Sequence, residues 1–332
     1  MNQKSIDVVG IGNAIVDVLI NSSNEFLEDN SLVKGGMTLI NENTANKLYK
    51  ERKNGLEISG GSAANTMVGI SQLGAQAAFI GRVKKDSLGE SFSKDLCSSG
   101  TVFNTPAINQ GPSTARCLIY ITPDAQRTMC TYLGASIFLD PQDLDFSLIK
   151  KAKILYLEGY LWDNPNAKKA FVSAALEAIN SGAKVALSLS DFLCIERHRE
   201  SFKELINNYI DILFANEDEL LALYETSDLE FAKKEVRKQC NLVALTKGKE
   251  GSLIIAKTKE YVINSYNFGK TIDTTGAGDL YASGFLYGYI NNYDLLTCGR
   301  IGSVCAGHIV TVLGSKPKES LKVLLNKNIN IP

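Results

Sequence analysis

The alternation of strand-like and helical segments restricts the fold of this chain more than any other feature. Apolar runs of strand length occur at 77–83, 154–158, 184–189, 211–216 and 242–247. Helical patterns separate or flank them, at 62–73, 86–99, 165–180, 197–208 and 217–239. This order predicts a mostly parallel sheet with helices on both faces. No repeat or low-complexity stretch is visible, so we expect one folding unit over residues 1–332.

Two regions interrupt this alternation. Residues 14–60 contain short strand-like runs around a polar turn, and residues 112–134 read as a hairpin that no helix covers. Together they predict a small antiparallel sheet outside the α/β core. Two interpretations remain, a lid over a substrate or an ordinary extension of the sheet edge.

The charge balance and the histidine content exclude several kinds of function. The chain has 35 Lys and Arg against 36 Asp and Glu, a formal net charge of −1, so no basic field attracts a nucleic-acid backbone. The chain has only two histidines, His198 and His308, which argues against a histidine triad or a multi-histidine metal site. General-base chemistry therefore falls to a carboxylate or a lysine.

Cysteine usage and the apolar start bear on the compartment. The seven cysteines are scattered and none forms a C-x-x-C pair, which favours neither a disulfide framework nor a zinc site. The apolar run at 6–20 is interrupted by Asp7, Asn13 and Asp17, so we expect neither a signal peptide nor a membrane span. A reducing cytoplasm is the expected location.

Residues 273–279, Asp-Thr-Thr-Gly-Ala-Gly-Asp, form the sharpest motif. They open a predicted helix, so the backbone amides of Gly276, Ala277 and Gly278 face an anion at its positive end. Asp279 then lies in the first turn, within reach of an oxygen that attacks phosphorus. The alternative is a glycine-rich turn in which Asp279 only complements the helix dipole.

A second group of residues has the chemistry to bind hydroxyl groups. Gly60 and Gly61 permit a bend or a close approach, and Asn65 one turn later offers a donor and an acceptor. Asn13 and Asp17 lie on one side of an otherwise apolar strand, where a carboxylate needs a partner such as two adjacent sugar hydroxyls. The alternatives are a capped helix start and a backbone-paired or solvent-facing Asp17.

Two further motifs follow predicted strands at the carboxyl edge of the sheet. Asn216 and Glu219 share one helical face and carry oxygen ligands that suit hydrated Mg²⁺, although the pair can equally be a helix cap. Residues 246–251, Thr-Lys-Gly-Lys-Glu-Gly, form a strand end and a tight turn that can pass beneath nucleotide phosphates. Neither motif is specific by itself.

The four motifs near residues 60, 216, 246 and 273 resemble, in the same order, those of the PfkB/ribokinase superfamily of carbohydrate and nucleoside kinases. Within that superfamily, residues 12–17, 32–41, 187–190 and 209–217 are most similar to adenosine kinases. The resemblance implies a ribokinase-like three-layer α/β/α fold with a mostly parallel central sheet and a small β-sheet lid. It also implies ATP- and Mg²⁺-dependent phosphorylation of a primary hydroxyl, most closely the 5′-hydroxyl of adenosine.

Carried over by position, the resemblance assigns a role to each candidate. Asp279 becomes the catalytic base, and residues 276–278 the anion hole for the γ-phosphoryl group. The other roles are hydroxyl binding by Asp17 and Asn65, a substrate border at Asn13, a lid hinge at Gly60 and Gly61, and Mg²⁺ organisation through water by Asn216 and Glu219. The ATP-binding positions are Ser188, Thr246, Gly248 and Gly251, and Arg127 in the hairpin resembles an arginine brought to the phosphates on closure.

Some questions stay open at this point. Lys84 and Ser188 depart from the common family pattern, which often has glycine and asparagine there. Tyr160 and Trp162 are candidates to stack on a purine, and the alternative is that they are ordinary loop anchors. The alternatives are a kinase of a free sugar such as ribose or fructose, and a non-catalytic nucleotide-sensing protein on the same fold. The resemblance also leaves open activation by a monovalent cation, and a monomer or a homodimer formed through the lid.

Overall fold

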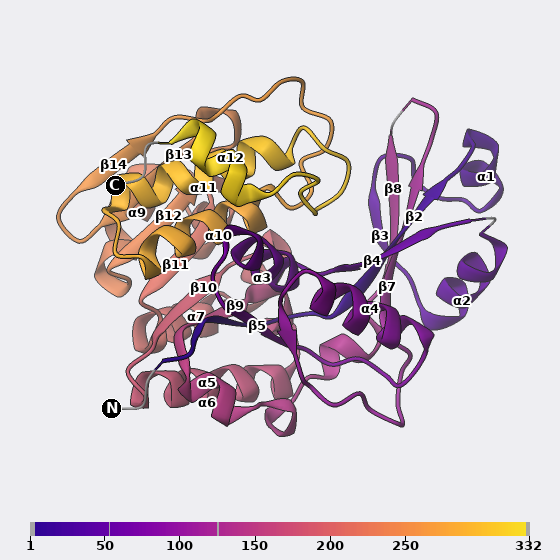
Figure 1. Ribbon diagram of the computed structural model, residues 1–332, viewed down its shortest axis with the longest axis horizontal. Helices are drawn as coiled ribbons and strands as arrows, with labels where there is room; N and C mark the ends of the chain where they lie inside the picture. The colour runs from indigo at the N-terminus through magenta and orange to yellow at the C-terminus, as the bar shows by residue number, and fades with distance from the viewer. Residues whose placement is uncertain (1–3, 53, 125, 330–332) are drawn as a thin grey trace.

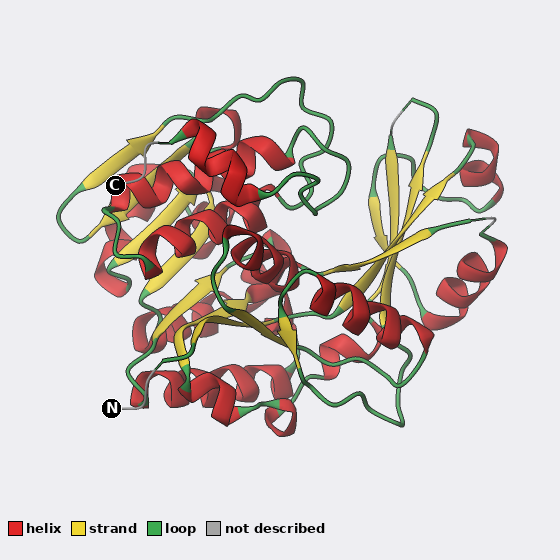
Figure 2. Cartoon of the chain, in the orientation of Figure 1, coloured by secondary structure: helices red, strands yellow, loops and turns green. Residues whose placement is uncertain are grey.

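The computed structural model describes residues 4–52, 54–124 and 126–329, and its strands form two separate sheets (Figures 1 and 2). The larger sheet has nine strands in the order β14-β13-β12-β11-β10-β9-β1-β5-β6. Their bounds are β1 (Ile6–Ile11), β5 (Ala77–Ile80), β6 (Val102–Phe103), β9 (Ala152–Glu158), β10 (Lys184–Ser188), β11 (Ile212–Asn216), β12 (Leu242–Thr246), β13 (Ser252–Ala256) and β14 (Glu260–Ile263). All neighbours from β6 to β12 are parallel, and β13 and β14 are antiparallel. The predicted mostly parallel sheet is confirmed.

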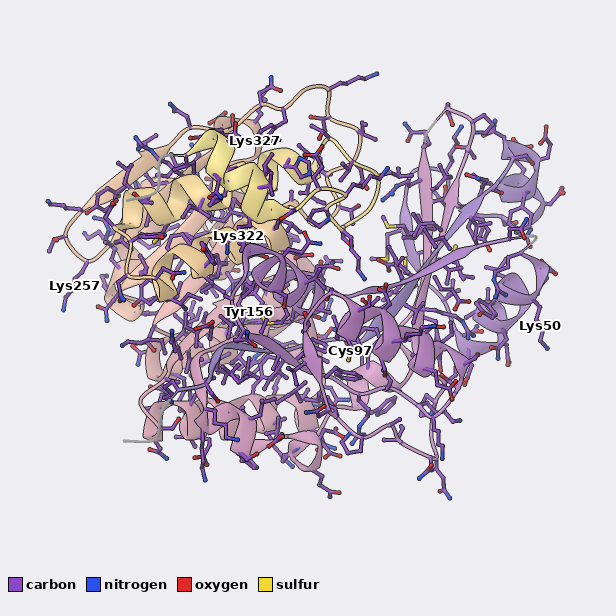
Figure 3. The ribbon with its side chains drawn as sticks, in the orientation of Figure 1. Lys50, Cys97, Tyr156, Lys257, Lys322 and Lys327 are labelled. Carbon is purple, nitrogen blue, oxygen red and sulfur yellow. The ribbon has the colours of Figure 1, made fainter. Side chains whose placement is uncertain are left out.

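Helices cover both faces of the larger sheet, because alternate residues of its buried strands face opposite ways. One face carries α3 (Ser62–Leu73), α10 (Ala277–Ile290) and α11 (Leu295–Ile309), with α12 (Leu321–Asn328) packed on α3 and α11. The other face carries α5 (Phe146–Lys150), α6 (Pro165–Asn180), α7 (Phe192–Tyr209), α8 (Glu217–Tyr224) and α9 (Leu229–Gln239). Tyr156 of β9 lies inside this layered body, as its label in Figure 3 shows.

The helix predicted over 217–239 is two helices. Glu225 ends α8 in the left-handed conformation, with a φ of 52°, and the chain restarts as α9 after the Asp228 cap. A continuous apolar pattern cannot reveal such a break, because both helices bury the same kind of apolar stripe.

Among the described residues, no helix combines the length and apolar character needed to cross a bilayer.

The smaller sheet, which we call the lid sheet, stands apart from the larger one in Figure 1. Its order is β3-β8-β7-β2-β4, and its bounds are β2 (Ile15–Asn21), β3 (Met37–Leu39), β4 (Leu56–Gly60), β7 (Ala115–Ile121) and β8 (Arg127–Tyr132). The strands come from the two predicted segments, in which residues 53 and 125 lie outside the described part. The sheet is mixed instead of antiparallel, because β2 pairs with β7 in parallel after a long crossover through the larger body. Helices α1 (Asn24–Asp29) and α2 (Glu42–Glu51) pack on one face, and α4 (Ser87–Ser98) contacts β4 and β2.

The strand order fixes where a ligand can bind. β1 lies between β9 and β5, so the chain adds strands on opposite sides of the sheet at the boundary of β1 and β9. In open α/β sheets, ligands bind at such a switch point, beyond the carboxyl ends of the strands. Asn13 follows β1 and Glu158 ends β9, so both lie at this point.

Candidate active site

The turn before α10 has the geometry of an anion-binding helix start. Gly276 precedes α10 with a φ of 77°, and no side chain caps the helix. A Cβ at Gly276 would lie 2.9 Å from the Cβ of Ser315, whereas nothing lies within 4 Å of one at Gly278. The Ala277 amide donates to the Thr274 carbonyl at 3.2 Å, so it is already engaged. Gly276 is therefore required for the turn, and Gly278 leaves it open to a ligand.

Asp279 is held by two side chains from the first turn of α3. Ser62 Oγ donates to Asp279 Oδ1 at 2.7 Å, and Asn65 Nδ2 donates to Asp279 Oδ2 at 2.9 Å. Burial raises the pKa of Asp279, and these two hydrogen bonds oppose the rise because they favour the charged form. The carboxylate is thus oriented at the edge of the anion-binding turn.

Asn65 is occupied by the protein on both sides of its amide. While its Nδ2 binds Asp279, its Oδ1 accepts a hydrogen bond from Ser315 Oγ at 3.1 Å. In this structure Asn65 orients Asp279, a role that its spacing in the sequence did not indicate.

The glycine pair allows three segments to meet. A Cβ at Gly61, whose φ is 98°, would lie 2.1 Å from the carbonyl oxygen of Asn13. A Cβ at Gly60 would lie 2.4 Å from Oδ2 of Asp17. The end of β1, the lid strand β2 and the start of α3 therefore touch at a point where no side chain fits.

Glu158 is a functional candidate that the sequence analysis missed. Its fully buried carboxylate accepts from the Asn13 amide (3.1 Å), Asn13 Nδ2 (2.8 Å) and the Ala63 amide (2.7 Å). Burial raises its pKa to about 7. The carboxylate joins the end of β1 to the helix that orients Asp279. The one signal in the sequence that could have indicated Glu158 is its position: it is an acidic residue at the end of an apolar strand, next to the switch point.

The lid sheet brings two charged groups to this place. Burial raises the pKa of Asp17 to about 7, and the positive charges of Lys316 and Arg127 oppose that rise. Arg127 Nη1 lies 2.5 Å from Oδ2 of Asp273 in a nearly buried ion pair. Within the described residues, Nε and Nη2 of Arg127 have no hydrogen-bond partner. A buried guanidinium with two unpartnered nitrogens is suited to an anionic ligand.

A cavity of about 500 Å³ lies next to the anion-binding turn. Thr246, Gly248 and Gly251 line one side of it, and Ala277 and Gly278 line another. The sequence analysis missed its aromatic wall, where Tyr266 and Phe268 stack with ring centroids 6.4 Å apart. An aromatic wall beside an anion-binding turn suits a nucleotide.

Three of the nucleotide-side candidates end neighbouring strands. Ser188 ends β10, Asn216 ends β11 and Thr246 ends β12. Asn216 and Glu219 form a reciprocal cap in which Asn216 Nδ2 donates to Glu219 Oε1 (2.9 Å) and the Glu219 amide donates to Asn216 Oδ1 (2.8 Å). Burial raises the pKa of Glu219 to about 7. The pair thus forms the helix cap that the sequence offered as the alternative to Mg²⁺ binding. No group of three or more His, Cys, Asp or Glu in the described ranges has metal-binding geometry.

Packing decides the role of Trp162 and shows the contact that Lys84 makes. Trp162 lies in the core against Phe171 and Phe202, with its Nε1 bonded to Ser201, so it cannot stack on a substrate. The short helix at Gly159–Asp163 turns it inward, which the position after a strand did not reveal. Lys84 Nζ donates to the Gly111 carbonyl at 2.7 Å.

Comparisons with known proteins agree with this geometry. Residues 38–320 match the pfkB family carbohydrate kinases. The structure of a probable sugar kinase protein from Rhizobium etli CFN 42 superposes with a TM-score of 0.90 at 40% identity, over 98% of this chain and 99% of that one. Adenosine kinase from Sinorhizobium meliloti gives a TM-score of 0.89 at 41% identity, over the same shares of 98% and 99%. A 5-dehydro-2-deoxygluconokinase of Geobacillus kaustophilus is 24% identical over 322 residues, 93% of this chain and 89% of that protein.

The family match spans most of the chain, and the two superposed structures cover 98% of it; these relatives are named as sugar kinases or as an adenosine kinase. The chain therefore belongs to the pfkB family of carbohydrate kinases and is a sugar or nucleoside kinase.

Proposed function

We propose that this kinase transfers the γ-phosphoryl group of ATP to the 5′-hydroxyl of a nucleoside, and that the nucleoside is adenosine. The observation that carries this proposal is the face of the lid sheet on which Asp17 lies. A free sugar presents hydroxyl groups almost everywhere, whereas a nucleoside presents a diol on one part and an apolar aromatic base on the other.

The face of the lid sheet around Asp17 is apolar. Strand register places Leu56, Leu19, Ile119, Met129 and Met37 in one row across the sheet, and Ile58, Asp17, Cys117, Thr131 and Leu39 in the next. Residues in register share one face, so in these two rows a single carboxylate lies among neighbours that are apolar apart from Thr131. Met37 is 57% exposed, Leu39 61% and Leu56 64%. This uncovered apolar surface beside a diol-binding carboxylate suits a nucleobase better than a free sugar.

The chain supplies the groups for in-line phosphoryl transfer. Asp279 takes the proton of the acceptor hydroxyl, whose oxygen forms the new bond to the γ-phosphorus while the bond to the bridging oxygen of ADP breaks. The Gly278 amide, in the first turn of α10, stabilises the charge on the transferring group together with the positive end of the helix. Asp17 accepts hydrogen bonds from the ribose hydroxyls, and Asn13 borders the ribose.

The nucleotide side of the site holds the phosphate donor. The cavity lined by Thr246, Gly248 and Gly251 takes ATP, and Tyr266 and Phe268 pack against its base. Arg127 offers its free Nε and Nη2 to the phosphates. Asn216 and Glu219 would hold Mg²⁺ through water, and the ion would neutralise phosphate charge when bound.

Phosphorylation of a free sugar is the second candidate, since the Geobacillus kaustophilus relative is a 5-dehydro-2-deoxygluconokinase. The two candidates share Asp279 and the anion-binding turn and differ in the use of the apolar lid face. Contact between a nucleobase and that face supplies binding energy that positions the acceptor hydroxyl. This contact therefore raises kcat/KM for a nucleoside as well as the affinity for it.

The deciding assay measures ATP consumption with Mg²⁺ and adenosine, inosine, guanosine, cytidine, ribose or fructose at equal concentration. We expect adenosine to give a kcat/KM orders of magnitude above that of ribose. 5′-Deoxyadenosine, which keeps the base and the diol but lacks the acceptor hydroxyl, serves as the matched control and should bind without turnover. Faster turnover of ribose or fructose than of any nucleoside refutes the nucleoside proposal and keeps the kinase. No turnover with any alcohol favours a nucleotide-sensing protein.

A further inference from the structure

Three consecutive residues after α11, Gly314, Ser315 and Lys316, each contact a different part of the site; we call them the strap. The Gly314 amide donates to Asp273 Oδ2 at 2.8 Å, which ties the strap to the anion-binding turn. Ser315 Oγ donates to Asn65 Oδ1 at 3.1 Å, which ties it to the amide that orients Asp279. No catalytic motif of the sequence includes these residues.

Lys316 ties the strap to the lid. Its Nζ lies 2.7 Å from Ser59 Oγ and forms an ion pair with Asp95 of α4. Ser59 is the residue before Gly60 and Gly61, and its amide and Oγ also donate to Asp95 Oδ2, at 2.7 and 2.8 Å. The Lys316 side chain is only 19% exposed, so solvent screens this contact less than a surface pair.

The Lys316 ammonium contacts Ser59, the neighbour of Gly60, and Gly60 in turn lies against Asp17. The Asp17 carboxylate packs against the Cα of Gly60, the neighbour of Ser59, so closely that a Cβ there would overlap it. Burial raises the pKa of Asp17, and among nearby charges Lys316 opposes that rise most. The charged groups that face Asp17 from the surrounding elements are Lys316, Arg127, Asp279 and Asp273.

We propose that Lys316 is a positioning residue for the acceptor substrate: it fastens the strap to the lid hinge and places its charge beside Asp17, which then meets the substrate as a carboxylate. The proposal rests on the proposed function, because it takes Asp17 as the group that binds the acceptor hydroxyls. Lys316 itself acts through Asp17 and Ser59.

The test compares Lys316→Met, which keeps the length and removes the charge, with the wild type in the adenosine assay from pH 5.5 to 9. An opposite charge nearby lowers a carboxyl pKa by about 1 unit or more, so the acid limb of kcat/KM should move up by about one pH unit. In the region of that limb, kcat/KM should fall roughly tenfold. The dissociation constant of ATP alone should not change. Lys316→Arg should restore the wild-type profile.

Asp95→Asn is the matched control, because it removes the hinge ion pair and keeps the lysine charge. It should not raise the acid limb, whereas Lys316→Met should. Both variants should speed amide hydrogen exchange at residues 56–61. If both variants weaken adenosine equally and leave the acid limb in place, the charge effect is refuted. If exchange at 56–61 matches the wild type in both, the hinge contact is refuted.

A failure of the proposal for Lys316 can be distinguished from a failure of the proposed function. The pH series can be run with whichever alcohol the wild type phosphorylates, and the exchange measurement needs no substrate. A wild-type protein that phosphorylates no alcohol refutes the proposed function and, with it, the role of Lys316 toward the acceptor. Amide hydrogen exchange at the hinge residues 56–61 then still tests whether Lys316 holds the strap to the lid.

Discussion

The larger body and the lid sheet satisfy the polar groups of the site in opposite ways. On the larger body, Asp279 has two side-chain donors and Glu158 has three protein donors. On the lid, Arg127 keeps two buried guanidinium nitrogens, Nε and Nη2, that have no partner within the described residues. Met37 and Leu39 remain exposed on the lid face that carries Asp17.

This difference indicates which groups of the site are fixed in advance and which are completed by a ligand. Groups that already have protein partners are held in place before substrate binds, as charge stabilisation in a transition state requires. Groups without partners gain them from a ligand, so the lid should be completed by the substrate. Four variants test this division, from the largest expected effect to the smallest.

Asp279→Asn should have the largest effect, on the preorganised side. The amide keeps the shape and cannot take the proton, so kcat should fall roughly 10²–10⁴-fold. ATP affinity should stay within about twofold, because the anion-binding amides are unchanged. Steady-state kinetics and calorimetric titration with ATP measure the two quantities. Near-normal turnover in a folded variant would remove Asp279 from the mechanism.

Asp17→Asn should affect the lid side alone. Loss of charged hydrogen bonds to the acceptor costs about 1.5–3 kcal/mol each, so kcat/KM for adenosine should fall at least tenfold. ATP affinity without adenosine should be unchanged. In the wild type, kcat/KM should decline as the pH falls through about 7, since the pKa of Asp17 is raised to about 7 and the carboxylate is the active form. Equal weakening of ATP and adenosine would instead make Asp17 a structural residue.

The Glu158→Gln variant and the wild type should differ in their free energy of unfolding by an amount that depends on pH. The folded pKa of Glu158 is raised from 4.5 to about 7, so its favourable contribution is present below pH 4.5 and is lost as the pH rises through 7. The wild type should therefore lose about 1 kcal/mol per pH unit relative to the variant over that window. Urea unfolding of both proteins at pH 5, 6, 7 and 8 measures it. A difference in unfolding free energy that is constant with pH would contradict the titration.

Leu39→Gln should give the smallest effect, on the uncovered lid face. Contact of a base with this side chain buries apolar area worth about 1 kcal/mol, so kcat/KM for adenosine should fall about fivefold. Turnover of ribose should not change, because ribose held at Asp17 lacks the base that would extend to Leu39, three strands away on the same face. Val262→Gln, at another exposed apolar residue on β14 of the larger sheet, is the matched control. An equal loss for ribose and adenosine would refute the nucleobase contact.

Much of the fold was predictable because it depends on local pattern. The run of buried strands and amphipathic helices indicates the parallel sheet, and the motif at 273–279 predicts the uncapped start of α10 that the structure contains. The division of 217–239 into α8 and α9 was not predictable, since a single left-handed residue, Glu225, breaks the helix. For Trp162 the sequence left open stacking on a purine or an anchor in the loop, because a side chain after a strand can face a ligand or fold back into the core; the structure shows it in the core.

The sequence by itself determined which residue types stand at the strand ends and helix starts, because turns, caps and hydrophobic period are local properties. Only the tertiary structure decided which of them meet. Asn65 and Asp279 lie 214 residues apart and share a hydrogen bond, and Lys316 reaches Ser59 across 257 residues. Glu158 has no motif, and its three donors come from segments that only the packing of β1, β9 and α3 brings together. Burial then raises the pKa values of Asp17 and Glu158, and burial is a property of the packed molecule, which no local sequence pattern contains.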